Sequence, residues 1–420
     1  MARFFAWYRS VFYTITWVTL LPAALGVVAS GPPLYAADVL PLEGPPFAAQ
    51  LASVDNQQFV FLPLQENQSP RVLAADAFVR WSHPVAPRSS TRVILERGDV
   101  IVAAKKWTSD GSLHLDENSL TVITDCCHEI ELPRQRVKAV LFGQQDQSRD
   151  LESRPMSGDA GDLRTDVVYF NNGDRLRATV LRLNGKEVLL QTGSTTRRVS
   201  ISQVESVVFS RTQLAPPDRW AARLAVGFQE GSLFYANRLR VDDQRLEMVL
   251  PGGVQLEGEN PEKIVFLQAL DGPRLQYLSQ TEAADYRHVP YFNIPWPYSR
   301  DQNLLGDRLQ SNGKSYLTGI SAHSASRIVY PLDGRFRRFE AEVALDDIAG
   351  RQGSVVFRVY LVRGGELQEV FASTILRGGD PSQAVTVDLE GATHLALVVD
   401  YADRGDELDH ANWLDARLVK

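Results

Sequence analysis

Cysteine is almost absent from this 420-residue sequence, which contains only Cys126 and Cys127, side by side. A disulfide framework, which small secreted domains use in place of a large core, is therefore excluded. Zinc sites usually take four ligands, with paired cysteines about two residues apart, whereas neighbouring residues of a strand point to opposite faces. We expect buried or free thiols, with a strained vicinal disulfide and a metal site as the alternatives.

Positive charge and helical periodicity are also scarce. The chain carries 44 lysines and arginines against 51 acidic residues, and its net charge of -7 gives no electrostatic attraction to nucleic acid or acidic lipid. Beyond the N-terminal segment, apolar and polar residues alternate in short runs bounded by Gly, Asn and Asp. The sequence predicts an all-β protein, and its length predicts more than one domain.

One long apolar run is present between Val11 and Ala29, and it follows Arg3 and Arg9. A basic start, an apolar run and small residues after it are typical of an export signal. The run is also nearly long enough to cross a bilayer, so an uncleaved anchor is the alternative. We interpret residues 1–37 as a signal peptide or N-terminal anchor of a secreted, periplasmic or cell-envelope protein, with a membrane as partner only in the second case.

A repeated unit accounts for most of the chain up to residue 270. Each copy opens with an apolar strand and a glycine turn, and it closes on an aromatic residue. The pairs of turn and aromatic are Gly98 with Phe142, Gly173 with Phe209, and Gly231 with Phe266. Copies of this length suit small bent sheets, so we predict tandem β-units that resemble SH3-like and Sm-like barrels. They are placed at 38–90 (a degenerate copy), 91–143, 165–212 and 218–270, with a polar linker at 144–164.

The β-units contain no set of His, Cys and carboxylate residues with catalytic spacing. We therefore expect them to act as a spacer or as an array that binds partner proteins of the cell envelope. Residues 271–314 differ in composition, since prolines are interleaved there with aromatics that include Trp296. Proline favours extended backbone, which predicts a connector. Its aromatics either pin it to a domain flank or form a ligand platform, and burial tendencies favour the first.

Residues 315–420 alternate between apolar and polar residues through seven segments, which predicts an antiparallel β-sandwich. If each short connection reverses the chain, several loops return to one end of the sandwich, where binding residues are usually placed. We call this end the pole. It is expected to hold His323, Asp346, Asp347, Asp380, Asp403, Asp409, His410 and Trp413.

Four ordered motifs in this segment resemble those of a known family. The stretches "YLTGISAHSASRIVYPLDG", "FEAEVALDD", "GSVVFRVYLV" and "LDHANWLDARL" are similar to the NPCBM family, also classed as carbohydrate-binding module family 51. The resemblance is strongest at Gly319, His323, Ser324, Asp346, Asp347, Gly353, Phe357, Asp409, His410, Trp413 and Asp415. It implies a jelly-roll, galactose-binding-like sandwich over 315–420 and a role in binding galactose-containing glycans.

Sugar binding needs an aromatic ring against the apolar face of a pyranose, and polar groups that bond neighbouring hydroxyls. The candidate carbohydrate-binding residues are His323, Asp346, Asp347, Tyr401, Asp409, His410 and Trp413. The alternative is structural: the polar residues cap loops or strand ends, and Trp413 fills the core, which is the interpretation we favour for Trp413. In the binding interpretation, Asp346→Asn weakens glycan binding with little effect on stability.

Glycoside hydrolysis needs two carboxyls that flank the scissile bond, but Asp346 and Asp347 are adjacent and point to opposite sides. We predict no catalytic residue and no enzyme. We also predict no cofactor, with a calcium ion held by Asp403, Asp406 and Asp409 as the weaker alternative.

The sequence as a whole predicts an exported, non-catalytic protein whose sandwich binds a glycan or polysaccharide, of galactose type or another. The rival prediction is a cell-envelope scaffold that binds protein and no sugar. Because the change in alternation falls near residue 272, the segment 272–420 is expected to fold by itself.

Overall fold

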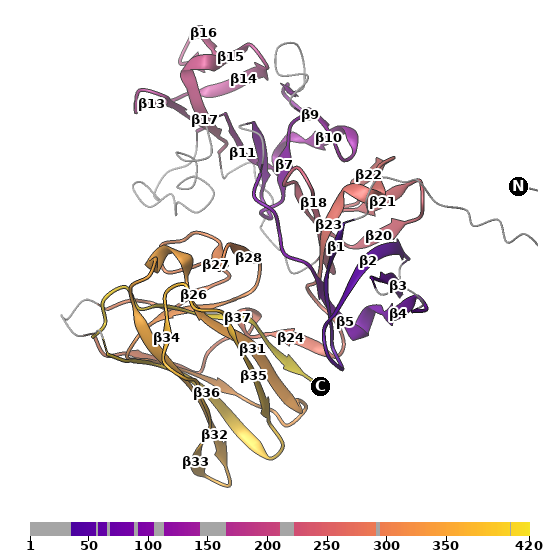
Figure 1. The fold of residues 1–420 in the computed structure, drawn as a ribbon. Helices are drawn as coiled ribbons and strands as arrows, with labels where there is room; N and C mark the ends of the chain where they lie inside the picture. Colours follow the sequence, from indigo (N-terminus) through magenta and orange to yellow (C-terminus); the bar gives the residue numbers. More distant parts are fainter. Residues whose placement is uncertain are drawn as a thin grey trace, which may run out of the picture. The chain divides into compact units, whose positions relative to one another are not determined.

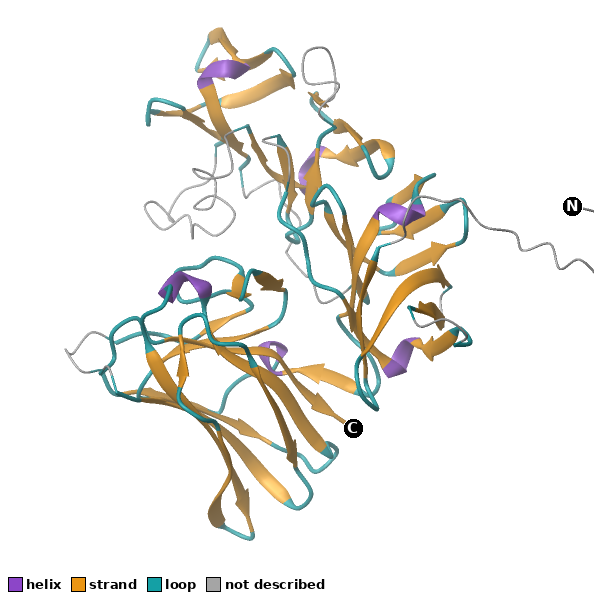
Figure 2. Ribbon diagram, viewed as in Figure 1, coloured by secondary structure: helices purple, strands orange, loops and turns teal. Residues whose placement is uncertain are grey.

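The computed structural model describes residues 35–55, 58–64, 68–87, 91–104, 113–142, 165–210, 222–290, 295–403 and 405–420. Strands make up nearly all of the regular structure, and each described helix is a 3-10 turn of three residues (Figure 2). The predicted all-β fold class is confirmed. The expected linker at 144–164, and the expected signal or anchor segment up to residue 34, lie outside the described residues.

None of the helices in the described part of the chain has the length and apolar character needed to cross a membrane.

The strands of the four β-units follow one another along the chain (Figure 1). The first unit contains β1 (Ala36–Pro41), β2 (Phe47–Val54), β3 (Gln58–Pro63), β4 (Arg71–Ala74), η1 (Ala75–Ala77) and β5 (Phe78–Trp81). The second contains β6 (Arg92–Leu95), β7 (Val100–Val102), β8 (Leu113–Leu115), β9 (Ser119–Thr124), β10 (His128–Pro133), η3 (Arg134–Arg136) and β11 (Val137–Leu141).

The third unit contains β12 (Val167–Phe170), β13 (Arg175–Arg177), β14 (Thr179–Asn184), β15 (Glu187–Thr192), β16 (Thr195–Ser200), η4 (Ile201–Gln203) and β17 (Val204–Val208). The fourth contains β18 (Leu224–Phe228), β19 (Leu233–Ala236), β20 (Arg238–Val241), β21 (Leu246–Val249), β22 (Gln255–Gly258), η7 (Pro261–Lys263) and β23 (Ile264–Ala269). In every unit a 3-10 turn directly precedes the closing strand.

The predicted glycine turns have the same backbone geometry in three units. Gly98, Gly173 and Gly231 have φ values of 91, 87 and 98°, which glycine adopts without a side-chain clash. In each turn the glycine N–H donates to the carbonyl three residues earlier, over 2.9 to 3.0 Å. A Cβ atom at Gly231 would lie 2.3 Å from the Cα of Pro87. The repeat in the sequence is therefore a repeat of the backbone turn.

The β-units pair in nested order, the first with the fourth and the second with the third. The closing strands pair antiparallel, β5 with β23 through Trp81 and Leu267, and β11 with β17 through Val140 and Val207. A second pairing joins each couple, β2 with β20 and β8 with β14. Each unit therefore completes its sheets with strands that are distant in the sequence.

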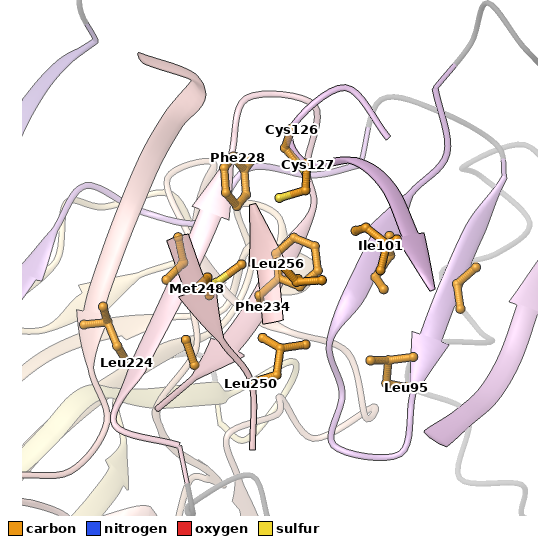
Figure 3. Close-up of a cluster of buried hydrophobic side chains, with 14 of the residues drawn as sticks. Leu95, Ile101, Cys126, Cys127, Leu224, Phe228, Phe234, Met248, Leu250 and Leu256 are labelled. Atoms are coloured by element: carbon orange, nitrogen blue, oxygen red, sulfur yellow. The ribbon is translucent and has the colours of Figure 1, made fainter. Parts of the chain in front are cut away.

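One hydrophobic core extends through all four β-units. Cys126 and Cys127 lie in it, at the turn between β9 and β10, in the same cluster as Phe228, Met248 and Leu256 (Figure 3). Both cysteines are buried and free, which confirms the predicted thiols, although a turn and not a strand holds them. Burial raises the pKa of the Cys126 thiol, so the less reactive protonated form is favoured.

The C-terminal sandwich consists of two antiparallel sheets around a second core (Figure 1). One sheet has the order β26 (Ser299–Arg300), β29 (Gly319–His323), β37 (His410–Val419), β31 (Arg338–Leu345) and β35 (Gln383–Asp388), and β24 (Leu275–Tyr277) also pairs with β37. The other has the order β25 (Asp285–His288), β30 (Ser326–Pro331), β36 (Ala392–Tyr401), β32 (Ser354–Arg363) and β33 (Glu366–Ala372), and β34 (Leu376–Arg377) pairs with β32. The remaining elements are η8 (Leu278–Gln280), η9 (Asp347–Ala349) and the hairpin of β27 (Leu309–Ser311) and β28 (Lys314–Tyr316).

Residues 271–314 do not form the extended connector that the prolines suggested. Strand β24 pairs with β37, β25 with β30 and β26 with β29, so this segment supplies strands to both sheets. These strands are only two to four residues long, and such short strands leave no period-two signal in the sequence. The sandwich therefore includes strands that precede residue 315.

A buried ion pair joins β5 of the first β-unit to β37 of the sandwich. Arg80 Nε donates to Asp415 Oδ2 over 2.8 Å, and the two side chains are 7% and 1% exposed. The other carboxylate oxygen of Asp415 accepts from Gln268 Nε2 at 3.1 Å and from Thr318 Oγ1 at 2.8 Å. Asp415 has a φ of 47°, which allows the strand to bulge at this point. Both charges are therefore desolvated and paired.

Candidate functional site

Strand register brings the predicted pole residues to one end of the sandwich. His323 at the end of β29 is the register partner of His410 at the start of β37. The Asp346 N–H, just after β31, donates to the His410 carbonyl at 2.8 Å. The Ser354 N–H, at the start of β32, donates to Asp409 Oδ1 at 2.8 Å. The loops at the ends of β29, β31, β32 and β37 therefore lie together at the pole, as the alternation of strand direction predicted.

At the pole, the Trp296 indole packs against the rings of two histidines. Its indole stacks on the ring of His323, with centroids 5.4 Å apart and planes 6° apart. The ring of His410 meets it edge-on at 5.7 Å and 84°, and His288 Nδ1 accepts the Trp296 backbone N–H at 3.0 Å. Trp296 is partly exposed, whereas His323 and His410 are each 5% exposed. One face of the indole is therefore supported from inside, and we call this arrangement the Trp296 platform.

The imidazoles that support the platform are uncharged near neutral pH. Burial, together with the neighbouring rings of His410 and His288, lowers the pKa of His323 to about 4. Burial also lowers the pKa values of His410 and His288. The Nδ1 atoms of His323 and His410 are buried and have no hydrogen-bond partner within the described residues. These two histidines are buried against the indole, and their role as ligand contacts stays a prediction.

The loop between β36 and β37 runs beside the Trp296 platform. The carboxylate of Asp406 is close enough to His323 and His288 to act on the pKa values of both, which it raises against the effect of burial. Asp409 is buried and anchors the loop through its bond to Ser354. Burial raises the pKa of Asp409 to about 6. Asp406 is thus the partly exposed carboxylate beside the platform.

Asp346 and Asp347 hold the β27–β28 hairpin against the end of β31. Asp346 is 1% exposed, and its carboxylate accepts hydrogen bonds of 2.7 to 3.2 Å from N–H groups of Asn303, Gln310, Ile348 and Asn412. Asp347 accepts from the backbone N–H groups of Asn312 and Gly313 at 2.7 and 2.8 Å. These contacts support the structural alternative for Asp346, which faces no solvent, whereas Asp347 is partly exposed.

Trp413 lies in the core of the sandwich. Its side chain is fully buried, and its ring meets Phe357 edge-on at 5.1 Å and Phe339 at 6.3 Å. A ligand at the surface cannot reach this ring, so the structure removes Trp413 from the ligand contacts and supports its interpretation as core.

Tyr401 remains at the surface, 57% exposed at the end of β36.

Asp380 accepts the Arg377 N–H at 2.8 Å, and Asp403 forms an ion pair with the Arg377 side chain. Asp409 accepts the Ser354 N–H through one oxygen, and a calcium ion at Asp403, Asp406 and Asp409 stays a prediction. Across the part of the chain that the structure describes, no three His, Cys, Asp or Glu side chains are placed to hold a metal ion.

The sequence interpretation underrated Trp296 and passed over His288. Both lie in the segment taken for a connector, and Trp296 entered only as the less favoured ligand platform. Their position depends on the pairing of β25 with β30, which sets His288 opposite Ser326. The one available signal was an aromatic between two prolines, Pro295 and Pro297.

The pole of the sandwich thus presents a partly exposed aromatic ring, Trp296, that is stacked on a buried histidine. Residues 275–419 match the family model of the NPCBM/NEW2 domain. This segment of the chain is an NPCBM domain, and the family is one of carbohydrate-binding modules. The match begins at the first residue of β24, in agreement with the strand pairing.

Two further comparisons concern the same part of the chain. The alpha-1,3-galactosidase B of Akkermansia muciniphila is 33% identical over 119 residues, which are 27% of this chain and 14% of that protein. The structure of CBM51 from Clostridium perfringens GH95 in complex with methyl-galactose is 30% identical, with a TM-score of 0.31, and the likeness covers 34% of this chain and 99% of that one. The chain spans only 9% and 14% of the lengths of the two curated relatives that it matches.

Proposed function

We propose that this protein is an exported, non-catalytic glycan-binding protein, and that the Trp296 platform is where the sugar binds. The observation that carries the proposal is the parallel stack of Trp296 on His323, which leaves the indole partly exposed at the pole. A fixed indole face suits the apolar side of a pyranose ring, and it loses little side-chain freedom on binding.

Polar groups for the sugar hydroxyls come from the loop beside the platform. Asp406 supplies a partly exposed carboxylate there. Tyr401 adds a second exposed aromatic at the same end of the sandwich. The membership of residues 275–419 in a carbohydrate-binding family supports a glycan as the ligand, and galactose-type sugars are the first to test.

The test is a glycan array probed with the full chain, followed by calorimetry on the sugars retained. Trp296→Ala is expected to abolish retention, whereas Trp296→Phe keeps an aromatic face and retains weaker binding. The melting temperature of each variant controls for folding. Unchanged binding by Trp296→Ala would place the site elsewhere, and a chain that retains no glycan would favour the rival scaffold function.

We further propose that the β-units act as a spacer or as a binding array for envelope proteins. Their support is the nested pairing, which makes the four units one body with an extended common core. A pull-down from envelope extract with residues 35–270 and with the full chain, compared protein by protein, tests this role. Recovery of no specific protein by either would leave the spacer function.

A further inference from the structure

The six-stranded sheet shared by the second and third β-units has two open edges. Its order is β10, β9, β8, β14, β15 and β16, so β10 forms one edge and β16 the other (Figure 1). Among the described strands, β10 pairs only with β9, and β16 only with β15. Strand β22 approaches the start of β10, where His128 Nε2 lies 3.6 Å from Glu259, but it does not pair with β10. Each edge strand therefore keeps a row of backbone N–H and C=O groups that can bond another strand.

The two edge strands carry opposite charges. Strand β16 contains Arg197 and Arg198 and no acidic residue, whereas β10 contains Glu129 and Glu131 and neither lysine nor arginine. All four side chains are exposed. No ion pair joins any of the four to another described residue. One sheet thus has a basic edge and an acidic edge, at opposite ends.

Charged and apolar residues alternate on both edge strands, so a pairing between them can match both faces of the sheet. In β10, Ile130 is buried in the common core and Glu131 faces the other side. In β16, Val199 packs against the same core and Arg198 faces the other side. An antiparallel pairing of β16 with the β10 of a second copy that sets Arg198 opposite Glu131 also sets Val199 opposite Ile130. Opposite charges that face each other across a strand pair stabilise the pairing.

The same charges decide which edges of two copies can meet. Two β16 strands would bring arginines together, and two β10 strands would bring glutamates together, and like charges directly opposite each other are destabilising. Charged residues on edge strands usually serve to keep edges apart. Here they keep apart only edges of the same sign, so the pairing that remains is between a basic edge and an acidic edge.

We infer that copies of this chain associate head to tail, with β16 of one copy added to β10 of the next. This contact joins two different surfaces, so every copy keeps one edge of each kind, and the assembly either continues as a filament or closes into a ring. Each copy carries one sandwich, and an assembly would present several sandwiches to a polymeric ligand at once. The inference goes beyond the proposed function and holds whether or not the sandwich binds sugar.

The test is analytical ultracentrifugation of residues 35–420, which form one compact unit and lack the apolar N-terminal run. The average mass should exceed that of one chain within a series that reaches about 100 μM, because a contact made by one strand is smaller than a standard interface. Raising the salt concentration from about 0.05 to 0.5 M should shift this association to higher protein concentration, since the paired charges are exposed. Association that does not respond to salt would contradict the inference.

Charge reversal tests the two edges separately. Arg197→Glu with Arg198→Glu makes both edges acidic, and Glu129→Lys with Glu131→Lys makes both edges basic. Each double variant should stay a single chain over the whole series. An equimolar mixture of the two should associate again, because acidic and basic edges can then alternate. Melting temperatures show that each variant folds.

The matched control is Arg238→Glu with Arg240→Glu, at two exposed positions of β20. It changes the net charge as much as reversal of the two β16 arginines does, and it should leave the association unchanged.

Three outcomes would overturn the inference. One is a wild-type protein that stays a single chain throughout, and retention of that protein on a sulfated polysaccharide through Arg197 and Arg198 would assign the basic edge to a polyanion. Another is association that persists in both double variants. The third is a pair of folded double variants that do not associate when mixed, because the two edges then do not meet.

Discussion

Two tryptophans of the sandwich have opposite surroundings. Trp413 is fully buried against Phe357 and Phe339, whereas Trp296 is partly exposed on His323. Trp413→Ala is expected to lower the free energy of unfolding by about 3 to 5 kcal/mol, because it leaves a cavity among aromatic rings. Trp296→Ala should cost much less and remove sugar binding. Denaturant titration of both variants measures the contrast, and equal losses would contradict it.

The position of Asp346 reverses the effect that the binding interpretation expected of Asp346→Asn, because it makes a loss of stability the main result. Its buried carboxylate accepts four N–H bonds, so Asp346→Asn turns an amide NH₂ toward donors. We expect a loss of about 2 to 3 kcal/mol of stability, the usual cost of losing hydrogen bonds to a buried charge. The matched control is Asp347→Asn, at a less buried position, which should cost about 1 kcal/mol as for the loss of a cap. A stable Asp346→Asn protein with weakened glycan binding would restore the earlier interpretation.

The lowered pKa of His323 makes the stability of the sandwich depend on pH. The folded state holds the ring neutral down to about pH 4, whereas the unfolded chain protonates it near pH 6.5. The stabilisation is therefore fully present above about pH 6.5 and is lost as pH falls toward 4, by about 3 kcal/mol. Asp409, with its pKa raised to about 6, acts in the opposite direction over the same range.

The effect of His323 is therefore measured as the difference in the free energy of unfolding between two proteins that both contain Asp409, so that the contribution of Asp409 cancels. Free energies of unfolding of the wild type and of His323→Gln are compared at several pH values from 7 to 4. The gap between them should narrow on acidification. A gap that stays constant would show that His323 does not titrate with a lowered pKa.

At the level of the strands, β5 and β37 are joined by the buried ion pair of Arg80 with Asp415. Arg80→Met leaves the buried Asp415 without its cation, and we expect a loss of about 3 to 5 kcal/mol. The double variant Arg80→Met with Asp415→Asn should recover part of that loss, since asparagine removes the charge and tolerates the positive φ. The exposed pair of Arg358 with Asp400 is the control, and Arg358→Met should cost at most about 1 kcal/mol. A double variant as unstable as Arg80→Met would show that charge burial is not the cause.

At the level of the full chain, the sandwich depends on the β-units more than its alternation pattern suggested. Leu275, Tyr277 and Val419 belong to the core of the β-units, and Asp415 takes its cation from β5. The segment 272–420, expected from the sequence to fold alone, should therefore melt at a lower temperature than the same domain in the full chain. Calorimetry of both proteins decides this, and equal melting temperatures would show that the interface adds nothing.

Much of this architecture could be predicted from the sequence because period-two alternation is a strong local signal. Most of the seven expected segments lie where the alternation placed them, although one of them is divided between β33 and β34. Reversal of direction at each turn was enough to bring His323 and His410 together. The glycine turns at Gly98, Gly173 and Gly231 were visible because only glycine adopts their φ freely. These features depend on neighbours along the chain.

The features that the sequence did not indicate depend on contacts across the fold. Strand β37 is buried at every residue, although its pattern suggested one apolar face, because its second face is covered too: Leu414 packs with Leu309 and Tyr316, and Asp415 is bonded to Arg80. Whether Asp346 faces solvent or a hairpin depends on where β27 and β28 lie, and alternation carries no information about that. The role of Trp296 depends on three histidines from three different strands or strand ends.

Nested pairing of the β-units also governs the order in which the chain can fold. Strand β5 pairs with β23. The ion pair of Arg80 can form only once Asp415, 335 residues further along, has been synthesised. Contacts of such sequence separation raise contact order and slow folding. A chain that leaves the ribosome or a translocation pore N-terminus first would expose the edge of β5 for most of that time, and exposed edges invite aggregation. The edge of β5 is covered only when β23 of the fourth β-unit has been made, so the first β-unit stays incomplete until then.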